Sequence, residues 1–385
     1  MRCAPCSARS RFDERVSLAS IVADRSILVC CGPGGVGKTT AAAALAVEAA
    51  LGGRRACVVT IDPAKRLADA LGLESLTNRP NRIEGEWPGE LWALMLDTKG
   101  TFDDLVQRYS ATAGQAQAIL ANGLYRNISG ALSGTQEYMA MEKLYELHHG
   151  GMADVPDFDL VVVDTPPTRN ALDFLDAPRR LTAFLDNRIF RLLVMPTRAY
   201  LKAVSVATQT FLRTISRVVG AEVVGDAIAF FEAFEGMEAG FRDRAGAVRD
   251  LLGAPETAFV LVSSPRPDAI EEATFFATKL AEVDMDVDAL VVNRLHPRFG
   301  ALDASTDDDR ERGNVTGSPL GILRSNLAEL DQMAAEEEAH LEPLAKQVAP
   351  APVARVPFLA GDVHDVAGLQ VIGDYLLGRE PAGEE

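Results

Sequence analysis

A glycine-rich turn followed by Lys-Thr-Thr is the part of this chain with the clearest chemistry. Residues 32–40 read GPGGVGKTT and meet the pattern G-x-x-x-x-G-K-[ST]. Glycines in such a turn let successive backbone N–H groups point inward around a phosphate. Lys38 can then face the phosphate oxygens, and the Thr39 hydroxyl is suited to Mg²⁺. An apolar run precedes the turn and an alanine-rich helix is expected over 38–51, so the sequence predicts a phosphate-binding loop between a strand and a helix.

Two aspartates stand where they could complete such a site. Asp164 follows the apolar run 160–163, and Asp62 follows the run 56–61, where Pro63 turns the chain out of the strand. A phosphate site needs a second metal-binding group and a group that orients the attacking water. Each aspartate could instead cap the helix that comes next.

The spacing of apolar segments indicates the fold that must position these groups. Continuous rather than alternating runs are typical of strands buried on both faces of a parallel sheet. We therefore predict an α/β fold with a doubly wound, mostly parallel sheet, whose strand ends meet beside the loop. The expected strands are 27–31, 56–61, 91–96, 159–163, 258–262, 287–292 and 353–356.

The lengths between these strands predict the domain organisation. We expect one domain over 21–375, with a helical subdomain inserted from about 98–157 and 178–252. Disorder is expected over 1–20, a mobile loop over 303–318, an acidic helix over 327–342 and a tail over 376–385.

Two stripes of apolar residues at helical spacing lie in the inserted segment, over 199–219 and 223–237. They could pack as core, or they could form a groove for a hydrophobic client that includes Phe230, Phe231 and Phe234. Adaptable grooves favour methionine. Only Met195 and Met237 occur in 180–250, which favours the core.

Composition narrows the possible partners. The formal charge is −17 and the pI is near 4.8, which argues against a nucleic-acid surface. No apolar stretch is long enough to span a membrane and no secretory signal is evident, so we expect a cytoplasmic protein. Cys30, Cys31 and Cys57 lie in predicted strands, and the pair Cys3 and Cys6 lacks a second pair to complete a zinc site.

Four segments in order resemble those of the ArsA family of ATPases. They are the loop at 32–40, TIDPAKRLADAL at 60–71, DTPPTRNALDFL at 164–175 and VVNRLHP at 291–297, and the resemblance spans roughly 25–375. It implies a P-loop ATPase with a deviant phosphate loop that binds ATP and Mg²⁺ and works as a face-to-face dimer, coupled to a membrane-protein partner or to a client.

The same resemblance implies roles for individual residues. Asp62 would position the attacking water, Asn293 would read the adenine edge and Pro357 would close the base pocket. Lys38 and Asp164 would act with Asp62 in hydrolysis, and Thr39 and Asp164 would hold the metal. The phosphates would be wrapped by Gly34, Gly35, Val36, Gly37, Lys38, Thr39 and Thr40.

Three departures from the family pattern refine these expectations. Pro33 stands where the family's loop has a lysine that reaches the partner's nucleotide, and Pro166, Arg169 and Asn170 stand where Ala, Gly and His are usual. No cysteine follows Cys57, so metalloid transport by thiolates is not expected. We predict a heterodimer with a paralogue that retains the lysine.

Two alternatives stay open. The chain could form a homodimer in which Arg169 or Lys65 replaces the missing lysine. It could instead be a nucleotide-gated chaperone or targeting factor that holds hydrophobic membrane-protein segments.

Overall fold

A computed structural model gives the fold of this chain. It describes residues 17–61, 66–123, 125, 135–150, 155–166, 226, 229–230, 238–298 and 319–379. The strands are β1 (Ile27–Cys31), β2 (Arg55–Thr60), β3 (Asn81–Ile83), β4 (Glu90–Met95), β5 (Leu160–Asp164), β6 (Thr257–Ser263), β7 (Ala289–Leu295) and β8 (Val353–Pro357). The described helices are α1 (Leu18–Asp24), α2 (Lys38–Leu51), α3 (Arg66–Ala70), α4 (Thr98–Tyr109), α5 (Ala113–Ala121), α7 (Thr135–His149), α13 (Glu238–Leu252), α14 (Pro267–Ala281), α15 (Pro319–Gln347) and α16 (Val366–Leu376).

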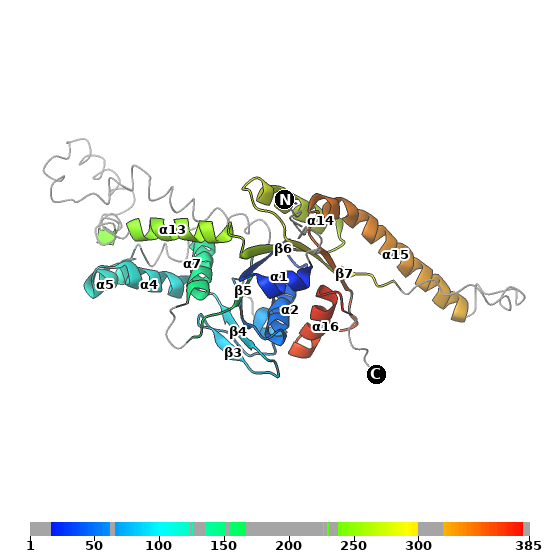
Figure 1. The fold of residues 1–385 in the computed structure, drawn as a ribbon, viewed down its shortest axis with the longest axis horizontal. Coiled ribbons are helices and arrows are strands. Elements are labelled where there is room, and N and C mark those ends of the chain that lie inside the picture. Colours follow the sequence, from blue (N-terminus) through cyan, green and yellow to red (C-terminus); the bar gives the residue numbers. More distant parts are fainter. Residues whose placement is uncertain are drawn as a thin grey trace, which may run out of the picture.

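The strands form one sheet in the order β3-β4-β2-β5-β1-β6-β7-β8 (Figure 1). Every neighbouring pair is parallel except β3 and β4. The predicted α/β class with a mostly parallel sheet is therefore confirmed. Each predicted strand is present with its ends shifted by a residue or more at several places, and the short antiparallel β3 was not predicted.

Both faces of the sheet are covered, which explains the continuous apolar runs. In β1, Leu28 and Cys30 belong to the core beneath α2, whereas Ile27, Val29 and Cys31 belong to the core on the opposite face. Alternate residues of a strand point to opposite faces, so a strand covered on both sides must be apolar throughout. On the first face α2 packs against several strands and against α16, while α7, α14 and α15 cover the other (Figure 1).

The small side chains of α2 set how closely it lies on the sheet. Ala42, Ala43 and Ala44 are fully buried. Alanine has no side chain to hold the helix away from its neighbours, and it is also the residue with the highest intrinsic helix propensity. The helix begins at Lys38, directly after the loop. Its N-terminus lies at the edge of the sheet where β1 and β5 end.

The described helices of the inserted segment pack on one another beyond β5. α7 contacts β5, α4 and α13, and Figure 1 shows α4, α5, α7 and α13 grouped at one end of the sheet. Glu142 of α7 is buried and pairs with Arg244 of α13 at 3.0 Å and with Arg108 of α4 at 3.5 Å. Phe230 is 5% exposed and stacks on Tyr125, which favours the core interpretation for this residue of the second apolar stripe.

Several expected boundaries differ from the structure. Residues 18–20, expected to be disordered, belong to α1, which begins with a capping box between Ser17 and Ser20. Residues 376–379, expected to be a tail, belong to the folded part of the chain because Arg379 pairs with Glu48 and Asp374. The helix predicted over 327–342 extends over 319–347 and passes through Pro343.

Other predictions fall on residues that the structure does not describe. These include 303–318, most of 178–237 with Phe231 and Phe234, the terminal residues 1–16 and 380–385, and the pair Cys3 and Cys6. Among the described helices, none combines the length and the apolar character needed to cross a membrane.

Candidate functional site

The phosphate loop connects β1 to α2 and depends on glycine at two close approaches. Gly32 has φ of +142°, and a Cβ built on it would lie 2.0 Å from the Val262 carbonyl oxygen of β6. Gly37, the N-cap of α2, has φ of +93°, and its Cβ would lie 2.2 Å from Asn293 Nδ2. These φ values disfavour other residues, and neither position has space for a side chain.

Lys38 and Thr39 occupy the first turn of α2, as the motif predicts. Lys38 is 7% exposed, and its Nζ donates a hydrogen bond of 2.8 Å to the Pro33 carbonyl oxygen. The Thr39 hydroxyl donates to Asp164 Oδ2 at 2.8 Å. The two residues predicted to hold a metal therefore meet, although they lie far apart in the sequence.

The strand order explains why Asp164 reaches this place. β5 lies between β1 and β2, so that Asp164 stands opposite Cys30 on one side and Thr60 on the other. Asp164 is the last residue of β5 and is 1% exposed. Its Oδ2 also accepts a hydrogen bond of 2.9 Å from the Thr60 hydroxyl, so two hydroxyl groups hold the same carboxylate oxygen. Sequence analysis did not select Thr60, although it lies two residues before Asp62.

The two cysteines at the end of β1 do not add a reactive thiol to the site. Burial raises the pKa of Cys30, and the nearby Asp164 carboxylate raises it further. Burial likewise raises the pKa of Cys31, despite the opposing effect of Lys38. Both thiols stay protonated at neutral pH, so they pack as small apolar side chains, as predicted.

A cavity of about 940 Å³ extends from the loop toward the ends of β7 and β8. Its size is that of a small-molecule site. Most of the residues predicted to contact the nucleotide line it, namely Gly34, Gly35, Gly37, Lys38, Thr39, Thr40, Asp164, Asn293 and Pro357. Val36 is absent from its lining, and Asp62 lies outside the described residues, as do Lys65 and Arg169. Sequence analysis missed Arg66, Arg294 and Phe358, which also line the cavity.

The Asn293 amide already contacts the chain. Its Nδ2 donates to the Val36 carbonyl oxygen at 2.9 Å, and its Oδ1 accepts from the Arg294 backbone N–H at 2.9 Å. An Asn amide has two donor hydrogens and two acceptor lone pairs. One of each is used here, so one N–H and one lone pair are left for the edge of a base.

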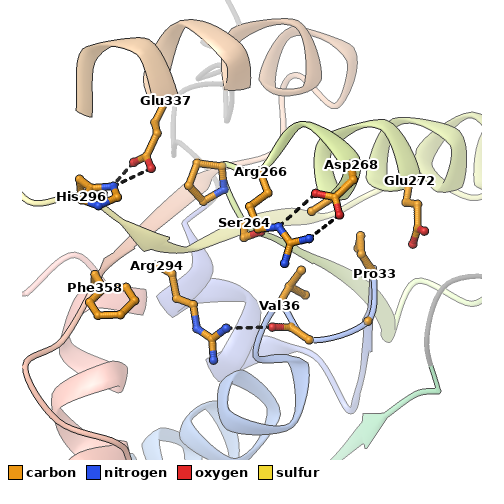
Figure 2. Close-up of a pocket in the computed structure, with 14 residues that line it drawn as sticks. Pro33, Val36, Ser264, Arg266, Asp268, Glu272, Arg294, His296, Glu337 and Phe358 are labelled. Atoms are coloured by element: carbon orange, nitrogen blue, oxygen red, sulfur yellow. Dashed lines mark hydrogen bonds and ion pairs between the residues drawn. The ribbon is translucent and has the colours of Figure 1, made fainter. Parts of the chain in front are cut away.

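A second cavity, of about 630 Å³, adjoins the same loop and shares Gly34 and Gly35 with the first. Figure 2 shows Pro33 and Val36 on one wall, with Arg266 and Asp268 at the start of α14 and with His296 and Glu337 opposite. His296 Nδ1 lies 2.7 Å from Glu337 Oε1, and Arg266 pairs with Asp268. Arg294 and Phe358 line both cavities and therefore stand between them. Among the described residues, no group of three or more His, Cys, Asp and Glu side chains could hold a metal ion by itself.

Comparison with known proteins places this geometry in a family. The family described as "Anion-transporting ATPase" (ArsA ATPase) matches residues 25–304. ATPase GET3 of Eremothecium gossypii is 26% identical over 354 residues, covering 90% of this chain and 88% of that protein. ATPase GET3B of Arabidopsis thaliana is 27% identical over 76% of this chain and 69% of its own length. Putative arsenical pump-driving ATPase 1 of Aquifex aeolicus is 21% identical over 92% and 79%. The chain belongs to the anion-transporting ATPase family, and it is an ATPase.

Proposed function

We propose that this protein hydrolyses ATP with Mg²⁺ at the loop between β1 and α2. The observation that most supports the proposal is the hydrogen bond from Thr39 to Asp164, because it joins a hydroxyl and a buried carboxylate beside the N-terminus of α2. Oxygen ligands of this kind are those that Mg²⁺ prefers, and a helix N-terminus attracts phosphate. The larger cavity gives the rest of the nucleotide a place toward Asn293 and Pro357.

The residues of the loop divide the work of hydrolysis. The backbone N–H groups from Gly34 to Thr40 surround the phosphates, and Lys38 exchanges its bond to the Pro33 carbonyl for phosphate oxygens. Thr39 and Asp164 hold Mg²⁺, which supplies positive charge to the phosphate oxygens. Asp62 positions the attacking water. Catalysis of this kind consists mostly of positioning and charge stabilisation.

We further propose that the chain works as a dimer with a paralogue whose loop retains a lysine at the position of Pro33. Proline has no cationic group, so this position cannot supply a cation to the partner's nucleotide. If this chain's own site needs a cation from across the dimer, the partner must supply it. A cation provided in trans can increase the rate by several orders of magnitude. The dimer would couple hydrolysis to a targeting or transport process.

The proposals are separable by experiment. Hydrolysis and mass are measured for the chain alone and with its paralogue, with and without EDTA. Lys38→Ala and Thr39→Ala should abolish hydrolysis, while Lys99→Ala, which removes an exposed lysine paired to Asp103, should not. Failure of the wild-type chain to bind Mg-ATP would overturn the ATPase proposal. A chain that dimerises and hydrolyses alone as fast as the pair does would overturn only the heterodimer, in favour of a homodimer.

A role as a chaperone for hydrophobic membrane-protein segments is less well supported. It requires the apolar stripes of the inserted segment to be exposed, but Phe230 is buried against Tyr125. The other residues of those stripes lie almost entirely outside the described part of the chain. Crosslinking of a hydrophobic peptide to the inserted segment only in the ATP-bound state would favour this function.

A further inference from the structure

An irregularity at the end of β7 directs two consecutive side chains toward the phosphate loop. The pairing of β7 with β8 shifts register between Asn293 and Leu295, and the residue between them, Arg294, has φ of +64°. In a regular strand, neighbouring side chains point to opposite faces. A bulge changes this alternation and is common beside active sites. A left-handed arginine is strained, so its presence here calls for a function.

Asn293 and Arg294 bind two consecutive carbonyl groups of the loop. Asn293 Nδ2 donates to the Val36 oxygen at 2.9 Å, and Arg294 Nη1 donates to the Gly35 oxygen at 3.1 Å. Figure 2 shows the Arg294 side chain extending from the strand to the loop. Both bonds span more than 250 residues of sequence, so they connect the end of β7 to the loop directly.

These bonds control where the N–H groups of the loop point. In a trans peptide the C=O of one residue and the N–H of the next lie in one plane and point in opposite directions. Holding the Gly35 carbonyl therefore orients the Val36 N–H, and holding the Val36 carbonyl orients the Gly37 N–H. The loop needs this restraint, because Gly35 and Gly37 have positive φ values and glycine peptides reorient easily.

We propose that the bulge at Asn293 and Arg294 is a clamp that pre-organises the phosphate loop, with Arg294 as a positioning residue for the phosphates. The inference rests on the proposed ATPase function. Arg294 is exposed, so water competes with its bond to Gly35. The bond therefore contributes no more free energy than a single hydrogen bond does. Loss of that bond is expected to weaken phosphate binding about tenfold at most.

The test compares Arg294→Ala and Arg294→Gly with a matched control, Arg298→Ala. Arg298 is also exposed, lies four residues away and makes no hydrogen bond to the described part of the chain. The Kd of Mg-ATP and of magnesium tripolyphosphate is measured by calorimetry, together with the melting temperature. Tripolyphosphate is included because it has no base or sugar.

The clamp predicts that both Arg294 variants lose affinity for the two ligands equally, by about three- to tenfold. Arg294→Gly should melt no lower than the wild type, because glycine tolerates the left-handed conformation. Arg294→Lys, which keeps one donor and the charge, should recover part of the affinity. Arg298→Ala should bind as the wild type does.

Three results would overturn the clamp. If the wild type binds both ligands and the Arg294 variants bind them equally well, the clamp fails while the ATPase proposal stands. If affinity falls for ATP but not for tripolyphosphate, Arg294 contacts the base or sugar instead. If the wild type binds neither ligand, the clamp fails together with the proposed function.

Discussion

The buried carboxylate of Asp164 offers a direct test of how the site is built. Its Oδ2 accepts hydrogen bonds from Thr39 at 2.8 Å and from Thr60 at 2.9 Å, while the residue itself is 1% exposed. Asp164→Asn keeps the shape and one acceptor oxygen for the two hydroxyl groups but removes the charge. Asp164→Ala removes the charge and the acceptor oxygen together. The pair therefore separates the structural role of the side chain from its role toward the metal.

The hydrogen bonds set the size of the expected effect on stability. A hydrogen bond to a charged group contributes about 1.5–3 kcal/mol, and one between neutral groups contributes about 0.5–1.5 kcal/mol. Losing two charged bonds makes Asp164→Ala less stable by roughly 3–6 kcal/mol, whereas Asp164→Asn retains neutral bonds and loses roughly 2–3 kcal/mol. These are upper values, because each change also removes the cost of burying a carboxylate.

The two variants should differ in stability but lose activity to a similar extent. Without the charge neither variant holds Mg²⁺ well, so both should lose hydrolysis by about a hundredfold or more. Urea unfolding measures the stability, and phosphate release at saturating Mg-ATP measures the rate. A folded Asp164→Asn that hydrolyses ATP within about threefold of the wild type would refute the metal-holding role. Equal stability of the two variants would refute the assignment of the threonine bonds.

Three further predictions concern the glycines of the loop, a buried glutamate of α2 and a buried phenylalanine of the inserted segment. Gly32→Ala should be clearly less stable than Gly35→Ala in thermal unfolding, because its Cβ would meet the Val262 oxygen at 2.0 Å. At Gly35 nothing lies within 4 Å of an added Cβ, so only the left-handed strain of about 1–2 kcal/mol remains. Equal losses of stability would show that φ alone matters. Burial raises the pKa of Glu48, so the folded state binds its proton more tightly than the unfolded chain, and this contribution to stability is lost as pH rises from the ordinary carboxyl pKa through the raised value. Glu48→Gln should flatten that dependence in melting curves against pH, and an unchanged slope would contradict it. Phe230→Ala should cost about 3–5 kcal/mol by leaving a cavity beside Tyr125, and a loss below about 1 kcal/mol would instead indicate an exposed stripe.

The strands were predictable because burial on both faces leaves a strong signal in the sequence. β5 and β6 are apolar throughout except for polar residues at their ends, and their positions follow directly from the hydropathy pattern. β3 has only three residues, reads Asn-Arg-Ile and pairs only with β4, so it has no pattern to detect.

The predicted acidic helix ended at 342, before Pro343, but α15 continues to Gln347. A proline inside a helix removes one backbone hydrogen bond and crowds the carbonyl group four residues before it, a cost that the packing of α15 on α14 can offset.

The site was predictable where a motif fixes the backbone, and less so where strands from distant parts of the chain meet. Lys38 and Thr39 follow from the loop pattern, and the contact between Thr39 and Asp164 follows from the rule that parallel strands end at one edge. The contributions of Thr60 and Arg294 depend on the register of neighbouring strands. A single polar residue at a strand end does not reveal which neighbour it will face, and a bulge has no signature in the residues themselves.

The contacts of Pro33 indicate what the proposed phosphate site needs from this residue. Pro33 lines the smaller cavity but not the larger one, which is the cavity proposed for the nucleotide. What the site takes from this residue is its carbonyl oxygen, which accepts from Lys38 at 2.8 Å and which any residue would supply. A proline in place of the lysine of the family pattern would therefore keep this contact within the proposed phosphate site while removing a cation that a partner could use. On this argument the chain alone should bind ATP normally, and any defect should appear in the rate of hydrolysis without a partner.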